Sequence, residues 1–60
     1  MRIQTLLTAA EEQLGYQVVD GTIDDAHFIL FVKDYKVEGF IKNGRTFNYP
    51  DDVAALDATA

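Results

Sequence analysis

The chain has 60 residues, a formal net charge of −5 at pH 7 and no cysteine. Its length fits one small domain over residues 1–60, which would bury only about 60% of the surface that the unfolded chain exposes. The lack of cysteine excludes disulfides and thiolate zinc sites, so self-association is the reinforcement that the sequence still allows, with a very well-packed core as the alternative.

The first predicted element is an amphipathic helix over residues 2–14. Gly15 is a suitable stop, because glycine accepts the left-handed conformation that often follows a helix. The apolar residues of this segment fall on one helical stripe, namely Ile3, Leu6, Leu7, Ala10 and Leu14. Glu11 and Glu12 lie near the end of the helix, where the helix dipole disfavours negative charge. They are therefore candidates for an acidic contact surface.

Two strands are predicted next. Residues 16–20 form a short strand candidate that ends at the turn signal Asp20-Gly21. Asp24 and Asp25 then precede residues 26–33, the most apolar segment of the chain. This segment is rich in aromatic and β-branched residues and is apolar on both sides, which predicts a strand in the middle of a sheet.

A β-hairpin is the clearest element of the sequence. Residues 36–42 and 45–49 flank Asn43-Gly44, a two-residue turn whose members both tolerate positive φ. This turn predicts a register in which Lys42 lies opposite Arg45, and Phe40 opposite Phe47. Pro50 ends the last strand, and the Pro50-Asp51-Asp52 segment is typical of a helix start. The predicted fold is α+β, with an N-terminal helix, a three- to four-stranded antiparallel meander and a short C-terminal helix.

The alternation of side chains predicts two different sheet faces if residues 34–35 form a tight turn. An aliphatic face, which suits the apolar stripe of the first helix, would hold Ala26, Phe28, Leu30, Val32, Val37, Gly39 and Ile41. The other face would hold His27 and Glu38 with the aromatic set Ile29, Phe31, Phe40, Phe47 and Tyr49. We expect the aromatic set to be a contact surface for a partner or for a second copy. A slip of one residue at the turn would exchange the two faces.

The sequence is poor in catalytic chemistry. It has no serine and no cysteine, so the usual nucleophiles are missing, and its four glycines form no phosphate-binding loop. His27 is the only side chain suited to proton transfer near neutral pH. We expect it to pack beside aromatic residues in its strand, and Asp24 and Asp25 to be turn residues. The chain is therefore predicted to be no enzyme and to need no cofactor or metal.

The location expected from the sequence is the cytoplasm. The longest apolar run, residues 28–32, is far shorter than the roughly 18 residues of a membrane span. The first ten residues lack the continuous apolar stretch of a secretory signal.

The function predicted from these features is that of an acidic interaction protein. It would act as a stoichiometric inhibitor or regulator of a larger protein machine, as phage anti-defence proteins such as anti-CRISPRs do, and one way to do so is to mask a nucleic-acid-binding surface. The candidate contacts are Glu11, Glu12, Asp20, Asp24 and Asp25, with Asp51 and Asp52 second. The alternative is a single-stranded nucleic-acid-binding module that uses Phe40 and Phe47 with a basic hairpin of Lys36, Lys42 and Arg45. The net charge makes nucleic acid the less favoured partner.

Overall fold

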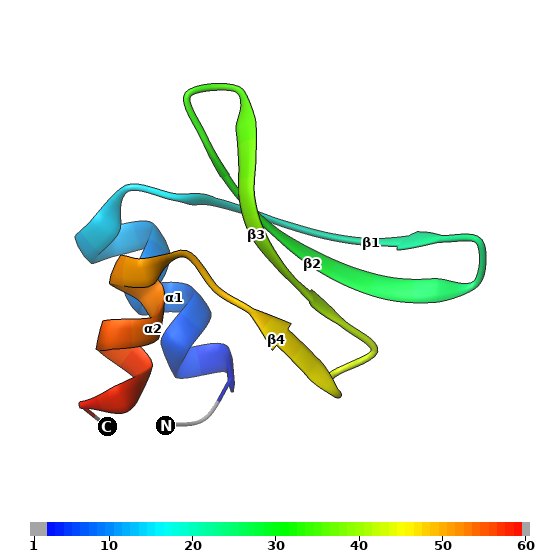
Figure 1. The fold of residues 1–60 in the computed structure, drawn as a ribbon. Coiled ribbons are helices and arrows are strands. Elements are labelled where there is room, and N and C mark those ends of the chain that lie inside the picture. Colours follow the sequence, from blue (N-terminus) through cyan, green and yellow to red (C-terminus); the bar gives the residue numbers. More distant parts are fainter. Residues whose placement is uncertain (1–2, 60) are drawn as a thin grey trace.

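The computed structural model describes residues 3–59. Its elements are, in chain order, α1 (Ile3–Leu14), β1 (Gln17–Ile23), β2 (Ala26–Lys33), β3 (Lys36–Lys42), β4 (Thr46–Asn48) and α2 (Asp51–Ala58). The strands form one antiparallel sheet in the order β1-β2-β3-β4 (Figure 1). The predicted α+β fold is confirmed, including its α-β-β-β-β-α order. The predicted helix start at residue 2 lies outside the described residues.

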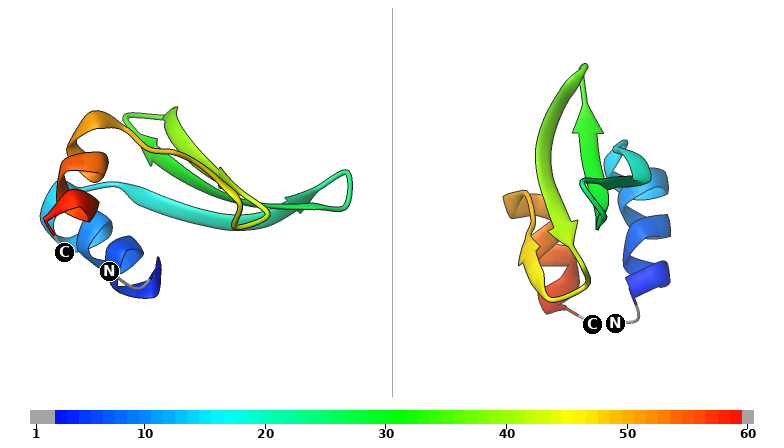
Figure 2. Two further views of the ribbon diagram at one scale, coloured as in Figure 1. Left: turned by 60° about the horizontal axis from the view of Figure 1, so that its bottom comes forward. Right: turned by 90° about the vertical axis from the view of Figure 1, so that its right-hand side faces the viewer.

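Both helices lie on one side of the sheet and pack against each other at one end of it, while the β1–β2 hairpin projects beyond them (Figure 2). The apolar stripe of α1 therefore has two partners, the sheet and α2. The core is made of the residues that this arrangement buries, namely Leu6, Leu7, Ala10, Tyr16, Ile29, Phe31, Ile41 and Val53.

The three hairpins of the sheet turn through pairs of residues with positive φ. The pairs are Asp24 and Asp25 (50° and 64°), Asp34 and Tyr35 (53° and 64°), and Asn43 and Gly44 (51° and 64°). Two consecutive left-handed residues give the turn twist that matches antiparallel strands. The predicted turn at Asp20-Gly21 is wrong, because β1 continues through these residues and pairs with β2 as far as Ile23.

A bulge in β3 decides which side chains share a face. Val37 pairs with Val32, but the next pair along the ladder joins Gly39 to Phe31, so Glu38 is an extra residue. Because side chains alternate along a strand, one inserted residue moves every later side chain of β3 to the other face.

The predicted assignment of the sheet faces is consequently wrong for β2. Ile29 and Phe31, expected on the exposed aromatic face, are buried under the helices. Phe28, Leu30 and Val32, expected to meet the first helix, lie on the opposite face and are only partly buried. The apolar content of the two faces is so similar that the sequence of β2 alone does not distinguish them.

The β3–β4 hairpin also differs from its predicted register. The Asn43-Gly44 turn forms as expected, and the Arg45 N–H donates to the carbonyl oxygen of Lys42 at 3.1 Å. Arg45 is then an extra residue, so the observed pairs are Lys42 with Thr46, Ile41 with Phe47, and Phe40 with Asn48. The turn is anchored to β2, since the Asn43 N–H donates to the His27 carbonyl at 2.8 Å and the Asn43 side chain accepts from the His27 N–H at 2.8 Å. Phe47 therefore lies on the helix side, with Ile41.

Gly39 allows the chain after β4 to cross close to β3. A Cβ at this position would meet the carbonyl oxygen of Asn48 and would lie 2.6 Å from the Cδ of Pro50. Neither group is the free end of a flexible side chain, so neither can move without shifting the backbone. The crossing brings the start of α2 to the helix side of the sheet, where Val53 enters the core.

The Gly39→Ala variant is expected to lose about 2–3 kcal/mol of unfolding free energy, because a new methyl group is forced against backbone and proline ring. Gly21→Ala is the matched control, since nothing lies within 4 Å of a Cβ there. This control should gain up to about 1 kcal/mol, because alanine has less conformational entropy to lose in a strand. Urea unfolding followed by circular dichroism measures both. Equal stability of the two variants would contradict the close crossing at Gly39.

Candidate interaction surfaces

The sheet side opposite the helices is an apolar surface that no helix of residues 3–59 covers (Figure 2). We call it the open sheet face and define it by Val19, Ile23, Ala26, Phe28, Leu30, Val32, Val37 and Phe40, which the strand register places on one side. Ile23, Val37 and Val19 are 55%, 51% and 39% exposed. Apolar patches on monomeric proteins are usually small unless they serve contact, so this face is a candidate interaction surface.

The centre of the open sheet face is aromatic and carries a cation. The rings of Phe28 and Phe40 lie 5.9 Å apart between centroids. The Nζ of Lys42 lies 5.9 Å from the centroid of Phe28, within the range of a cation–π contact. Two neutral polar residues also belong to this side of the sheet. Gln17 pairs with Val32, and Asn48 pairs with Phe40.

The predicted aromatic set is divided between several environments. Phe40 alone of the five lies on the open sheet face. Ile29 and Phe31 are in the core, and Tyr49 is partly buried with its ring 5.9 Å from that of Phe31. Phe47 is 49% exposed on the helix side, in contact with the Tyr49 ring. The predicted contact surface is therefore wrong as a set, because the bulge at Glu38 and the extra Arg45 shift the register of β3 and β4.

The two helices form an acidic layer. Glu11, Glu12, Asp51, Asp52 and Asp57 all belong to α1 or α2. Within residues 3–14 and 51–58, these helices contain no lysine or arginine. We call these five residues the acidic helical layer.

The other predicted acidic contacts are not part of this layer. Asp24 and Asp25 are turn residues, as expected, at the tip of the β1–β2 hairpin, whereas Glu11 and Glu12 lie near the far end of α1 (Figure 1). Asp20 belongs to β1 and faces the helix side. The five residues predicted as one acidic contact are thus divided between α1, the middle of β1 and the tip of the β1–β2 hairpin.

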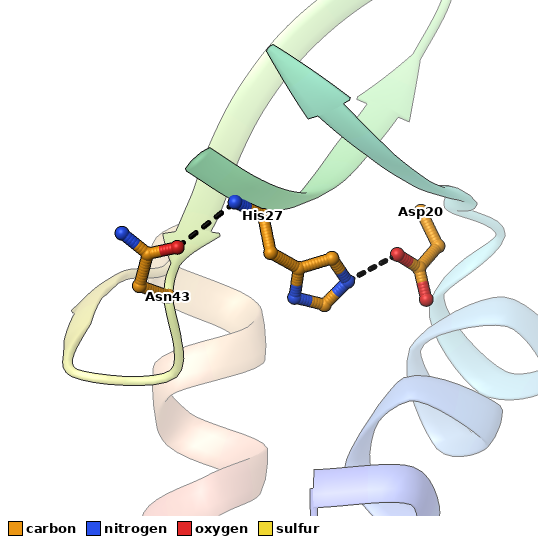
Figure 3. Close-up of polar contacts among 3 residues, drawn as sticks. All are labelled: Asp20, His27 and Asn43. Carbon is orange, nitrogen blue, oxygen red and sulfur yellow. Dashed lines mark hydrogen bonds and ion pairs between the residues drawn. The ribbon is translucent and has the colours of Figure 1, made fainter. Parts of the chain in front are cut away.

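A small polar cluster joins β1 and β2 to the β3–β4 turn. The Nε2 of His27 contacts the Oδ1 of Asp20, and the His27 backbone is held by Asn43 (Figure 3). The two side chains are 51% and 65% exposed. The structure adds a partner that was not expected for His27, an acid from the neighbouring strand. Among the described residues, no group of three His, Cys, Asp or Glu side chains could hold a metal ion.

Asp52 has a structural role that the sequence did not indicate. Its Oδ1 accepts from the hydroxyl of Tyr16 at 2.9 Å and from the Val53 N–H at 2.9 Å. This contact ties the start of α2 to the segment between α1 and β1. Burial, donation to Asp52 and the negative charges of Asp52 and Glu38 together raise the pKa of Tyr16 to about 12. Burial, with the charge of Asp57, also raises the pKa of Tyr49.

The predicted basic hairpin is also divided. Lys42 and Arg45 flank the β3–β4 turn, but Lys36 lies at the opposite end of β3, where it pairs with Lys33. The Nζ of Lys33 donates to the carbonyl of Leu14 at 3.2 Å and lies 5.1 Å from the centroid of the Tyr16 ring.

Tyr35 is an exposed residue that sequence reasoning passed over. Its side chain is fully exposed, and its φ of 64° is one that glycine or asparagine adopts with less strain. The exposure of Tyr35 could have been predicted from the sequence, because a residue in the tight turn at 34–35 lies on neither face of the sheet.

Comparisons with protein-family models, with curated proteins and with solved structures found no match to this chain. Within residues 3–59, neither helix has the length and apolar character required to cross a bilayer.

The Tyr16 contact predicts a pH dependence of stability. The folded pKa of about 12 is above the unfolded value of 10.0, so the neutral phenol stabilises the folded state fully below pH 10 and this contribution is lost as the pH rises toward 12. Between pH 9 and 12, the wild type should lose roughly 2–3 kcal/mol more unfolding free energy than Tyr16→Phe. Urea unfolding across this range measures the difference.

Tyr35→Phe is the control, because it removes a hydroxyl group that lies outside the core. A wild type and a Tyr16→Phe variant that lose stability in parallel would contradict the buried contact with Asp52.

Proposed function

We propose that the chain is a non-enzymatic, cytoplasmic interaction protein that docks on a larger protein as a stoichiometric inhibitor or regulator. The acidic helical layer makes the contact, and the partner offers a basic surface of the kind that receives nucleic acid. The observation that carries the proposal is the separation of the surface into an acidic helix side and an apolar sheet side.

The charge distribution supports an electrostatic contact. The chain has ten acidic and five basic residues, yet α1 and α2 contribute five of the acids and, over residues 3–14 and 51–58, none of the bases. A surface of one sign attracts an oppositely charged partner and speeds its association. Because exposed charges are screened by salt, the affinity should fall as ionic strength rises.

Glu11 and Glu12 are costly for the fold itself, which supports a role in contact. Both are exposed and lie near the C-terminus of α1, whose own last turn has no basic residue; the Nζ of Lys33 from β2 donates to the Leu14 carbonyl there and offsets part of the cost. Each costs about 0.3–1 kcal/mol in this position, because the helix C-terminus carries partial negative charge. By contrast, Asp51 and Asp52 lie in the first turn of α2, where negative charge is favourable.

Matched neutralisation tests the proposal. Glu11→Gln with Glu12→Gln removes two charges from α1, and Asp24→Asn with Asp25→Asn removes two from the hairpin tip, where asparagine tolerates positive φ. A tagged wild-type chain is used in native host cells to identify a partner by quantitative mass spectrometry. The purified pair is then measured by calorimetry at two salt concentrations.

The helix variant should bind the partner at least about tenfold more weakly while being more stable by roughly 0.6–2 kcal/mol. The hairpin variant should bind as the wild type does. Full affinity of the helix variant would refute contact through the acidic helical layer, and a partner whose binding is insensitive to salt would refute its basic character.

A second candidate function is supported by the centre of the open sheet face. Phe28, Phe40 and Lys42 combine two neighbouring rings with a cation, which are the materials of single-stranded nucleic-acid binding. These residues differ from the predicted pair, since Phe47 lies on the other side of the sheet.

Fluorescence anisotropy with labelled single-stranded oligonucleotides tests this alternative at low salt. Binding that is lost in Lys42→Gln and in Phe40→Leu, and kept in Lys36→Gln, would support it. The absence of binding at low salt would reject it.

A further inference from the structure

We propose that the open sheet face is the interface of a homodimer, in which two copies pack sheet against sheet. The inference goes beyond the proposed function, because it concerns the apolar side of the molecule and leaves both acidic helical layers on the outside. Its occupant is a second copy of this chain.

The chemistry of the face suits a copy of itself. In a twofold interface the same patch meets itself, so an apolar surface is complementary to its own copy whereas a charged surface is not. The defining residues are all apolar, and Val19, Leu30 and Phe40 form a continuous row across three strands through their ladder pairs. Lys42 pairs with Phe28 and is the one charged residue that the register of the described strands places on this face. Its Nζ lies 5.9 Å from the centroid of the Phe28 ring.

The position of the acids removes the main obstacle to self-association of a chain with net charge −5. The ten acids belong to the helices, the turns and the helix side of the sheet. The acid inside β3, Glu38, is in the bulge, and its charge acts on Tyr16, which lies on the helix side. Two copies in face-to-face contact would therefore keep the carboxylates of their helices on opposite sides of the dimer, and the turn residues Asp24, Asp25 and Asp34 would lie at its rim.

The area suits a weak, reversible interface. The strands contain 7, 8, 7 and 3 residues, which at about 3.3 Å per residue and about 4.8 Å between strands present roughly 400 Å2. Two such faces cover roughly 800 Å2 in total, which lies in the range of weak and transient interfaces. Twisted sheets pack face to face about 10 Å apart with closely aligned strands, and this arrangement would give the 60-residue chain a second apolar core.

Pairing through the exposed edge of β1 is a less favourable arrangement. It would extend the sheet and place two open sheet faces side by side, so their apolar residues would stay in water. Face-to-face contact is the arrangement that covers them.

Sedimentation equilibrium from about 5 µM to about 500 µM tests the proposal, because an interface this small is expected to be weak. The wild type should rise to twice the 6.7 kDa of one chain and stop there. Val37→Asp should weaken the dimer at least about tenfold. Gln4→Asp, an equal change of charge on an exposed position of α1, should leave it intact.

A thiol measurement keeps the test valid if Val37→Asp fails to fold. The chain has no cysteine, so Val37→Cys and Gln4→Cys each carry a single thiol. The rate of thiol labelling at Val37→Cys should fall as protein concentration rises, while that at Gln4→Cys should stay constant.

Three results would overturn the inference: a monomer at all concentrations, a dimer that Val37→Asp does not weaken, or open-ended growth, which indicates edge pairing. Binding of a larger partner by the Val37→Asp monomer would leave the proposed function standing by itself. The Glu11 and Glu12 variant makes the opposite separation. If it loses partner binding and still dimerises, the partner contact and the dimer interface are different surfaces.

Discussion

The structure depends on the limited area that two short helices can cover. Helices of 12 and 8 residues shield one side of a four-stranded sheet, and they do so at one end of it. Gly39 makes this possible for α2, because the absence of a side chain lets the chain cross β3 and return to the same side as α1. The contact from Tyr16 to Asp52 then holds the second helix in place. With both helices on one side, the other side of the sheet is left to solvent or to another molecule.

The distribution of charge follows the same division. Eight of the ten acids belong to the helices and the turns, and the apolar open sheet face has only Lys42 as a charged neighbour in the described register. A chain of this size gains little stability from surface charges, so the separation is better explained by contact than by folding. The acidic side suits a basic partner, and the apolar side suits a copy of itself.

The sequence was sufficient for the elements and insufficient for the register. Periodicity and turn residues predicted both helices, the strands β2 and β3 and the Asn43-Gly44 turn. The Asp20-Gly21 dipeptide was misleading, because a glycine in an edge strand and a glycine in a turn give the same local signal. The insertion of Glu38 into β3 and of Arg45 after the last turn left no recognisable pattern, since a bulge is selected by tertiary contacts such as the crossing at Gly39. The face assignment failed for this reason, and the predicted aromatic surface failed with it.

The accessibility of individual methyl groups tests the central claim most directly. Methyl relaxation can be measured by NMR with a dissolved paramagnetic agent, at a concentration low enough to keep the protein monomeric. The account predicts strong relaxation enhancement at Leu30, Val32 and Val37 and weak enhancement at Ile29 and Ile41. The reverse order, with the first group protected and the second exposed, would show that the helices cover the opposite face and would contradict the account.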